Sequence, residues 1–330
     1  MARSVCLIVN PAAGGGRSAR ARPGVQRALE RLGLTTRTVS TRDLDHAREL
    51  AVQAARAAET VVTLSGDGLI GAVAGALSAH PDAVLGVLPG GRGNDLVRVL
   101  GISRDPLKAC EVIAEGVEHA LDLGEVDGRP FIGIASVGFD SDANRIANAA
   151  PSRLGNLVYA YGALRTLSHW RAASFAVELD PPGPKHRFSG YTVAAANSPA
   201  YGGGMFLAPD ALLDDGRLDV VVIERLGRLR YLANLPKVFK GTHVQLPTVT
   251  VMRAAEVHIT ADRPFTMFAD GDPIGELPVR VRAIRGAVRV LVPAAFAAQS
   301  ARSAHRELQA PDGAGPGPRG PTAADRAPRG

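Results

Sequence analysis

The stretch Thr63-Leu64-Ser65-Gly66-Asp67-Gly68-Leu69-Ile70-Gly71 (TLSGDGLIG) decides how the first third of the chain is organised. It sets an aspartate between two glycines, directly after an apolar run at 60–64 and directly before an alanine-rich run at 70–79. A short apolar run, a glycine turn and a helical run are together typical of a buried strand that leads into a helix. An Asp-Gly pair alone is usually an ordinary turn, so the neighbouring segments have to support this interpretation.

The same alternation recurs on both sides of this stretch. Strands are predicted at residues 5–9, 37–40, 60–64 and 83–88, and helical runs follow near Val25, Leu44, Ile70 and Asn94. Strands that are apolar throughout need cover on both faces, and helices between them supply it. Residues 1–121 are therefore predicted to form a doubly wound, mostly parallel α/β domain.

Glycine-rich loops follow three of these predicted strands, at residues 10–17, 65–68 and 89–95. Because parallel strands end at one edge of a sheet, we expect the loops to converge there. Glycine turns at helix starts let backbone N–H groups approach phosphate oxygens, and the helix dipole adds partial positive charge. The spacing matches neither the P-loop, since no Gly-Lys-Ser/Thr follows, nor the dinucleotide-binding pattern.

An aspartate inside a phosphate-binding loop needs an explanation of its own. If a Mg²⁺ ion lies between the carboxylate and the phosphates, Asp67 binds the metal directly or through water. Alternatively, Asp67 caps the helix that begins near Leu69. The loop alone leaves both interpretations open.

The character of the sequence changes after Leu121. Short β-branched runs separated by Gly, Pro and Asp predict a mainly antiparallel β domain over residues 122–293. The runs lie at 130–137, 174–179, 191–196, 218–223, 257–259, 265–268, 279–283 and 288–292, with helical insertions at 154–168 and 229–240. Periodicity is lost after Ala298, so the C-terminal segment 294–330 is predicted to be largely a disordered tail.

Composition narrows the class of protein. With 46% hydrophobic and 21% charged residues the chain is typical of a soluble globular protein, and its net charge of +6 favours anionic partners such as nucleotides or lipid surfaces. Dispersed arginines and 5% aromatic residues argue against nucleic acid as a partner. The first residues are too weakly apolar for a signal peptide, and the longest uncharged stretch, 191–209, contains proline and glycine. We therefore expect a cytoplasmic protein whose membrane contact is peripheral and whose Cys6 and Cys110 are reduced thiols.

Several separated motifs together resemble the catalytic domain of the diacylglycerol kinase and sphingosine kinase superfamily, particularly its soluble bacterial lipid kinases. They are VNPAAGGG (9–16), LSGDGLIGAVAGAL (64–77), LGVLPGGRGNDLVRVLGI (85–102), DLG (122–124), YGGGMFLAPDALLDDGRLD (201–219) and FADGD (268–272). They follow the family's order over roughly residues 5–293. The resemblance implies an ATP-binding α/β domain, a β-sandwich domain and phosphorylation of a lipid alcohol in the cleft between them.

The loops and the resemblance together predict the site residues. ATP contacts are expected at Asn10, Pro11, Ala12, Ala13, Gly14, Thr41, Ser65, Gly66, Asp67, Gly68, Leu69, Gly91, Arg92, Gly93 and Asn94. Asp270 and Asp272 fall on the family's Asp-Gly-Glu motif, which implies catalytic roles for them beside Asp67. Asp272 is one methylene shorter than the usual Glu, and which of the two carboxylates accepts the proton stays open. Taken alone, 265–273 is a β-hairpin with an Asp-Gly turn.

The segment 212–217 resembles the structural Mg²⁺ site of the bacterial members. The resemblance implies a metal bound by the carboxylate of Asp215 and the carbonyls of Leu212 and Arg217. Taken alone, Asp-Asp-Gly is more often a plain turn before a strand.

The chain also departs from the family pattern. Ser65 and Leu69 replace a usual Gly and Thr, Gly71-Ala72 replaces an Asn-Glu pair, and Arg92 replaces a Thr. These changes keep the backbone of the phosphate loops but remove side-chain ligands. Two alternatives therefore remain: a catalytically impaired nucleotide- or lipid-binding regulator, and a kinase of a soluble substrate related by fold to NAD kinase.

Apolar and basic side chains near 153–171 offer a surface for lipid, although an ordinary core-packed helix explains the same pattern. The acceptor lipid and the oligomeric state, including a homodimer, are not determined by the sequence.

Overall fold

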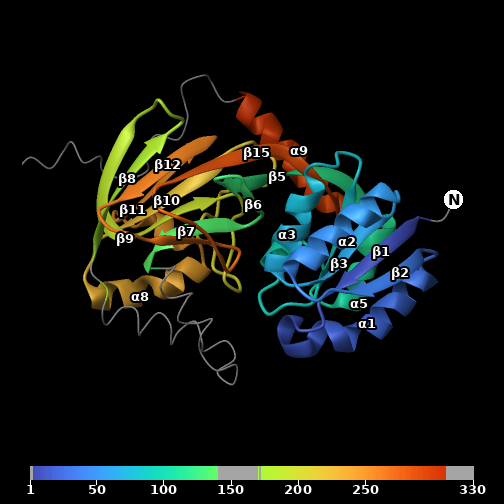
Figure 1. The fold of residues 1–330 in the computed structure, drawn as a ribbon. Helices are drawn as coiled ribbons and strands as arrows, with labels where there is room; N and C mark the ends of the chain where they lie inside the picture. The colour runs from blue at the N-terminus through green and yellow to red at the C-terminus, as the bar shows by residue number, and fades with distance from the viewer. Residues whose placement is uncertain (1–2, 140–169, 171, 310–330) are drawn as a thin grey trace, which may run out of the picture.

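Two lobes joined by shared strands make up the computed structural model, which describes residues 3–139, 170 and 172–309 (Figure 1). The predicted helix at 154–168 and the tail from 310 onward lie outside the described residues. The predicted fold class is confirmed: an α/β lobe is followed by an antiparallel β-sandwich lobe.

The first lobe is a parallel sheet in the order β2-β1-β3-β4. Its strands are β1 (Ser4–Val9), β2 (Thr35–Ser40), β3 (Thr60–Ser65) and β4 (Val84–Pro89), and each overlaps a predicted one. Its helices are α1 (Ala13–Arg31), α2 (Leu44–Arg56), α3 (Asp67–Leu77), α4 (Asp95–Val99) and α5 (Pro106–Glu115). Helix α1 packs with α5 and α2 packs with α3, so the sheet is covered on both faces.

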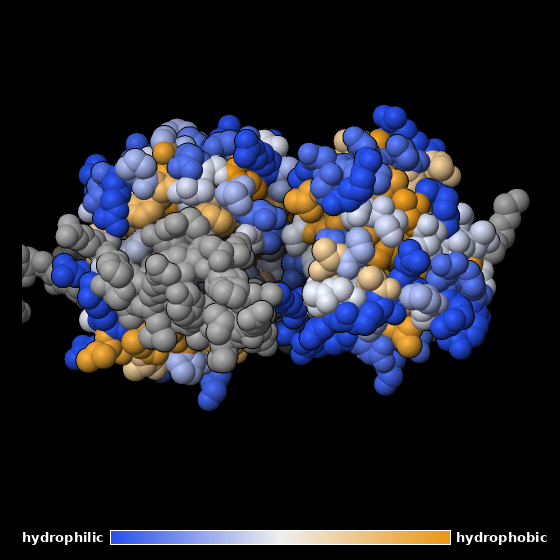
Figure 2. Space-filling model, turned by 60° about the horizontal axis from the view of Figure 1, so that its bottom comes forward, coloured by the Kyte–Doolittle hydropathy of each residue, from blue (hydrophilic) through white to orange (hydrophobic). Residues whose placement is uncertain are grey.

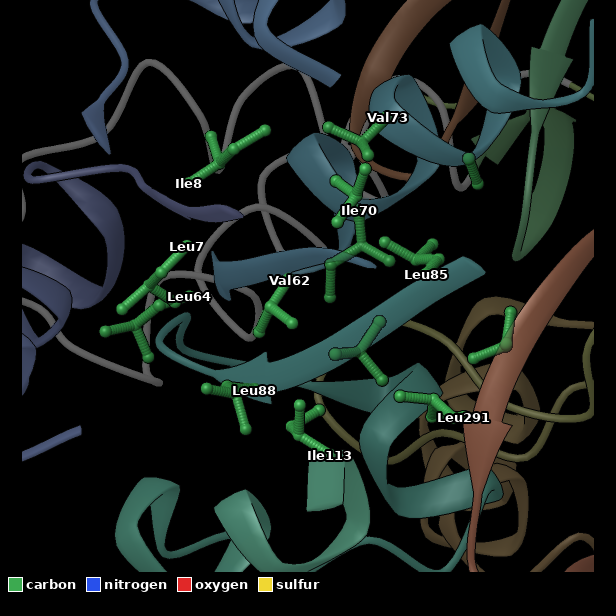
Figure 3. Close-up of a cluster of buried hydrophobic side chains, with 14 of the residues drawn as sticks. Leu7, Ile8, Val62, Leu64, Ile70, Val73, Leu85, Leu88, Ile113 and Leu291 are labelled. Atoms are coloured by element: carbon green, nitrogen blue, oxygen red, sulfur yellow. The ribbon is translucent and has the colours of Figure 1, made fainter. Parts of the chain in front are cut away.

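The core of this lobe explains why β1, β3 and β4 are largely apolar, whereas the edge strand β2 is polar and partly exposed. Figure 3 shows Ile70 and Val73 of α3 on one side of the sheet and Ile113 of α5 on the other. Leu291, from near the C-terminal end of the described chain, belongs to the same buried cluster. Cys6 and Cys110 lie in this core as free thiols, and burial raises the pKa of each to about 11.

The second lobe surrounds a separate buried cluster with antiparallel strands. Its strands are β6 (Arg129–Phe131), β7 (Ile134–Gly138), β8 (Ala173–Leu179), β9 (Lys185–Ala196), β10 (Leu218–Glu224), β11 (Val249–Ala254), β12 (Glu256–Ala261), β13 (Thr266–Ala269) and β14 (Asp272–Glu276). The helix predicted at 229–240 is present as α8 (Arg228–Phe239), and the short 3₁₀ helix η2 (Thr242–Gln245) follows it.

Two long strands belong to both lobes. Strand β15 (Val279–Val292) pairs with β12 of the second lobe, with β4 of the first, and along most of its length with β5 (Val117–Val126). The predicted boundary at 121 falls inside β5, and the two strands predicted at 279–283 and 288–292 are one strand with a shift of register between Ile284 and Val288.

A buried carboxylate holds the irregular part of β15. Asp122 of β5 accepts hydrogen bonds from the N–H groups of Gly286 at 2.7 Å and Gly216 at 2.5 Å. Gly286 has a φ of +58°, which glycine adopts without steric cost. The bend between the lobes is therefore fixed by a specific side chain.

The prediction of a disordered segment from residue 294 is wrong at its start, because α9 (Ala294–Gln309) is helical. Alanine favours the helix strongly, and Phe296 and Ala297 pack on the first lobe's core. The ring of Phe296 also meets that of His119 edge to face at 5.6 Å. Helix propensity, an amphipathic pattern and these contacts thus order the run.

Among the described helices, none combines the length and the apolar character needed to cross a bilayer.

Candidate active site

The three glycine loops meet at the carboxyl edge of the parallel sheet, as predicted. A methyl group built on Gly14 would lie 2.4 Å from the carbonyl oxygen of Gly90, and one on Gly91 would lie 2.5 Å from Cα of Gly66. Both distances are too short for any larger residue, so glycine at these positions lets the loops touch through their backbones. The result is a continuous surface of main-chain atoms.

The first loop offers a run of backbone N–H groups. Ala12 donates its N–H to Oδ1 of Asn10 at 3.1 Å, which turns the chain after β1. Gly14, Gly15 and Gly16 all have positive φ, at +60°, +67° and +85°, and a methyl group on Gly15 would meet nothing within 4 Å. Consecutive glycines in this conformation can direct several N–H groups toward one anion.

The second loop begins α3. Ser65 is buried, and its carbonyl accepts the N–H of Gly90 at 2.8 Å. The side chain of Leu69 is also buried in the first lobe's core, which explains an apolar residue where the family carries a hydroxyl. Only the backbone of these two residues faces the loop surface, together with Gly66 and Gly68.

The third loop is closed by its own asparagine. Asn94 accepts the N–H of Gly91 at 2.8 Å and donates to the carbonyl of the same residue at 3.0 Å. Its side chain is therefore occupied in shaping the loop, whereas Arg92 is exposed and free to turn toward a phosphate. Thr41, at the end of β2, likewise donates its hydroxyl to the carbonyl of Asp43 at 2.6 Å.

Two acidic side chains lie beside Gly93. Oδ1 and Oδ2 of Asp67 accept the N–H groups of Leu96 at 3.0 Å and Asp95 at 3.1 Å, so Asp67 caps α4 rather than its own helix. Oδ2 of Asp95 accepts the N–H of Gly203 at 2.7 Å, but its buried Oδ1 accepts no hydrogen bond from the described residues. Burial, followed by the nearby charge of Asp67, raises the pKa of Asp95.

The second lobe brings the hairpin turn of β13 and β14 to this place. Asp270 sits in the turn with a φ of +51°, and its oxygens accept the N–H groups of Ile132 and Gly133, each at 2.9 Å. Burial raises its pKa to about 7, against the lowering effect of these hydrogen bonds. A methyl group on Gly71 of α3 would lie 2.6 Å from Oδ2 of Asp270, so α3 and the turn are in contact.

Asp272 has a different environment, although it is only two residues away. It is exposed, and its carboxylate makes no hydrogen bond within the described chain. Its Oδ2 would lie 3.3 Å from a methyl group on Gly68, at the amino end of α3. Burial raises the pKa of Asp272, and the positive charge of Arg48 on α2 lowers it.

A glycine loop of the second lobe completes the contact between the lobes. Gly202, Gly203 and Gly204 have positive φ of +62°, +86° and +110°, and a methyl group on Gly204 would overlap the guanidinium of Arg98. The loop therefore wraps closely around α4, and its N–H at Gly203 reaches Asp95.

Comparison with known proteins agrees with this arrangement. Residues 4–126 match the diacylglycerol kinase catalytic domain, and residues 133–292 match the YegS C-terminal NAD kinase beta sandwich-like domain. A diacylglycerol kinase of Mycobacterium tuberculosis is 32% identical over 297 residues, which cover 88% of this chain and 95% of that protein. The chain belongs to the diacylglycerol kinase-like lipid kinase family.

Two further proteins are similar to this chain. The diacylglycerol kinase of Bacillus subtilis is 28% identical over 276 residues, covering 82% of this chain and 90% of that one. The crystal structure of a diacylglycerol kinase from Bacillus anthracis superposes with a TM-score of 0.70 over 89% of this chain and 98% of that chain. At 19% identity this last likeness concerns the fold alone.

In the segment that resembles the family's structural Mg²⁺ site, the carboxylate of Asp215 is paired with donors of the protein itself. Oδ1 of Asp215 accepts the N–H of Arg217 at 2.8 Å, and its Oδ2 is paired with the guanidinium of Arg253. Asp219 lies 3.9 Å from Nε of the same arginine. The guanidinium supplies the positive charge that a cation would bring, and its N–H groups occupy the carboxylate that a cation would need.

The described residues contain no cluster of three or more His, Cys, Asp or Glu side chains suited to a metal ion. The metal predicted at Asp215, Leu212 and Arg217 would use one carboxylate and two backbone carbonyls, so it stays a prediction.

The sequence reasoning missed three contributors to the site. Asp95 was quoted within a loop motif, but its position directly after Asn94 gave no sign that it faces another lobe. Gly203 and Arg48 come from segments whose patterns predict only a turn and an exposed helix position. A family resemblance flags the motif around Gly203, but only the fold brings Gly203 to Asp95 and the charge of Arg48 near Asp272.

Proposed function

We propose that the chain is an ATP- and Mg²⁺-dependent kinase that phosphorylates the hydroxyl group of a diacylglycerol-like lipid. The observation that carries the proposal is the position of Asp272. Its carboxylate belongs to the second lobe and faces the amino end of α3. The three loops beside it have backbone N–H groups suited to binding phosphate. Membership of a lipid kinase family supports the same reaction class.

Backbone groups hold the nucleotide in this proposal. The N–H groups of residues 14–16, 66–68 and 92–93 bind phosphate oxygens, and Arg92 adds a positive charge. Asp67 and Asp95 would hold the Mg²⁺ that accompanies ATP, since Oδ1 of Asp95 accepts no hydrogen bond from the described residues and lies 3.9 Å from the guanidinium of Arg98. Mg²⁺ commonly takes one or two carboxylates together with substrate phosphates, and it neutralises the developing charge on them.

Asp272 is the proposed general base, and Asp270 is a positioning residue. The lipid oxygen attacks the γ-phosphorus as the bond from that phosphorus to the bridging oxygen breaks, and ADP leaves. Asp272 accepts the hydroxyl proton, because its oxygens are free of hydrogen bonds from the described chain. Asp270 cannot do so as readily, since each of its oxygens already accepts a backbone N–H.

The test incubates the purified protein with labelled ATP, Mg²⁺ and total lipid extract and identifies the labelled product by mass. We expect a phosphorylated lipid. Asp272→Asn should lower kcat by roughly 10²- to 10⁴-fold, the usual contribution of a general base. Equal far-ultraviolet circular dichroism and thermal stability show that the variant is folded.

Other outcomes identify the alternatives. Phosphorylation of NAD or of a sugar phosphate, with no lipid product, would assign the chain a soluble substrate. Binding of nucleotide or lipid without any phosphorylated product would make it a regulator. If Asp272→Asn kept full activity, Asp272 would not be the general base.

A further inference from the structure

We propose that the outer face of α8 docks the protein on an anionic phospholipid bilayer. The inference rests on the proposed function, because a kinase of a membrane lipid must reach its substrate at a bilayer surface. Helix α8 is a different element from the segment 153–171, which the sequence offered as a surface for lipid.

Helix α8 has two faces of different character. Tyr231, Leu235 and Val238 point inward and belong to the second lobe's core or pack against it. Leu229, Ala233 and Pro236, spaced by four and three residues, share the opposite face and are exposed. Leu229 is 83% exposed, more than any other large hydrophobic side chain of the described chain.

An exposed aromatic ring lies on the same helix as the apolar strip. Phe239, in the last turn of the helix, is 53% exposed. Figure 1 draws α8 on the outer side of the second lobe, away from the first lobe. Figure 2 shows an apolar patch bordered by hydrophilic residues at the lower edge of the same lobe. Such a protruding strip is suited to insertion between lipid head groups.

The charges beside the strip favour an anionic partner. Arg230 and Lys237 flank it on one side, Arg228 lies on the other, and Lys240 follows directly after the helix. Helix α8 itself contains no aspartate or glutamate. A helix with an apolar strip and flanking cations typically lies in the plane of an anionic membrane surface. A protein partner would not require basic residues on both sides of a narrow apolar strip.

Sedimentation with vesicles tests the proposal without nucleotide. Vesicles of phosphatidylcholine containing 30–40% phosphatidylglycerol, roughly the charge of an anionic bilayer, are compared with pure phosphatidylcholine. We expect the wild-type chain to bind the anionic vesicles and to be released by salt. Leu229→Glu and the double variant Arg230→Glu, Lys237→Glu should each weaken binding by about tenfold or more.

The matched control is Leu107→Glu. Leu107 is an exposed leucine, 46% accessible, on α5 of the first lobe, so it carries the same substitution away from α8. It should leave vesicle binding unchanged. If both α8 variants bind vesicles like the wild type, the docking surface is elsewhere and the proposal fails. Retained vesicle binding together with loss of a protein partner would assign the face to protein recognition instead.

Activity measurements separate this inference from the proposed function. With a short-chain diacylglycerol in free solution, the α8 variants should keep wild-type kcat, whereas with diacylglycerol in anionic vesicles they should lose activity. A wild-type chain that binds vesicles through α8 but phosphorylates no lipid would overturn the kinase assignment alone. Equal activity of wild type and variants on vesicles would overturn the docking surface alone.

Discussion

At the scale of single residues, the two aspartates of one hairpin turn differ because their neighbours differ. Asp270 is fixed by two backbone N–H groups, and Asp272 is exposed between Gly68 and the charge of Arg48. The amino-acid types are identical, so their roles depend on position in the fold. A base must be ionised to act, and this requirement gives a test by pH.

Arg48→Met should move the acidic limb of the kcat/KM profile to higher pH. Burial raises the pKa of Asp272 and Arg48 lowers it, so removing the guanidinium raises that pKa further. The ionised base is lost as pH falls through this pKa, and the loss then begins at a higher pH. Steady-state kinetics from pH 5 to 9, about the range in which proteins stay folded, provide the measurement. Arg56→Met, on the same helix, is the control, and an unmoved limb would contradict the assignment.

Gly71→Ala should damage the site through Asp270. The new methyl group would lie 2.6 Å from Oδ2 of that carboxylate and would displace it from its backbone donors. We expect a fall in kcat and a loss of about 1–3 kcal/mol in the free energy of unfolding, typical of overpacking. Gly227→Ala is the control, since a methyl group there meets nothing within 4 Å. Urea unfolding and kinetics measure both effects, and wild-type behaviour of Gly71→Ala would exclude this contact.

Residue roles were only partly predictable from the sequence. The glycine loops were, because glycine at a strand end has a local reason that sequence displays. The hydrogen bonds of Asp67 were not, since the capping hypothesis placed its carboxylate at the helix that begins near Leu69, whereas it caps α4. Contacts between segments far apart in the chain carry no local signal.

At the scale of elements, the most informative turn is the one that precedes β10. Asp215 is 7% exposed and Arg253 is 22% exposed, so their ion pair is largely shielded from water. This pair occupies the place in which the resemblance predicts a metal. The turn should therefore be stable without divalent ions.

Arg253→Met tests the arginine in this role. Removing one partner of a buried pair leaves an uncompensated carboxylate and should cost about 3 kcal/mol of unfolding free energy. Added Mg²⁺ should stabilise the variant in part but leave the wild type unchanged. Arg289→Met is the control, because its pairs with Asp82 and Glu118 are exposed and such pairs contribute about 0–1 kcal/mol. The measurement is denaturant unfolding with and without MgCl₂. If Mg²⁺ stabilised the wild type as much as the variant, Arg253 would not take the place of a metal.

Elements with a strong period were predictable, and those fixed by tertiary contacts were not. The four parallel strands lie within two residues of prediction at each end, because apolar runs in a covered sheet are continuous. Strand β5 begins with Val117-Glu118-His119, whose polar residues do not predict a strand, and α9 is amphipathic but was assigned to the tail. Both are held by neighbours that sequence does not reveal.

At the scale of the whole molecule, the lobes are not independent. Strand β15 contributes Val290 and Leu291 to the first core and Val279 and Val281 to the second. A cut between Asp127 and Gly128 would leave the first fragment without β15, so that β4 and β5 lose a partner. We expect neither 1–127 nor 128–330 to unfold cooperatively alone, and we expect the two to reassemble when expressed together.

Circular dichroism melting of each fragment and of the mixture provides the measurement. The control is the chain without residues 311–330, which lie outside the described residues, and it should melt like the full chain. A cooperative transition of fragment 1–127 alone would show that the first lobe needs no shared strand.

The irregular step in β15 also sets how the site can open. Because one continuous strand runs through both lobes, the lobes cannot move apart as they could on a flexible linker. The shift of register at 284–288, held by Asp122, instead allows only limited elastic bending, because paired strands beside it stiffen the chain. We therefore expect the lobes to open by only a small amplitude and to return to the arrangement described above.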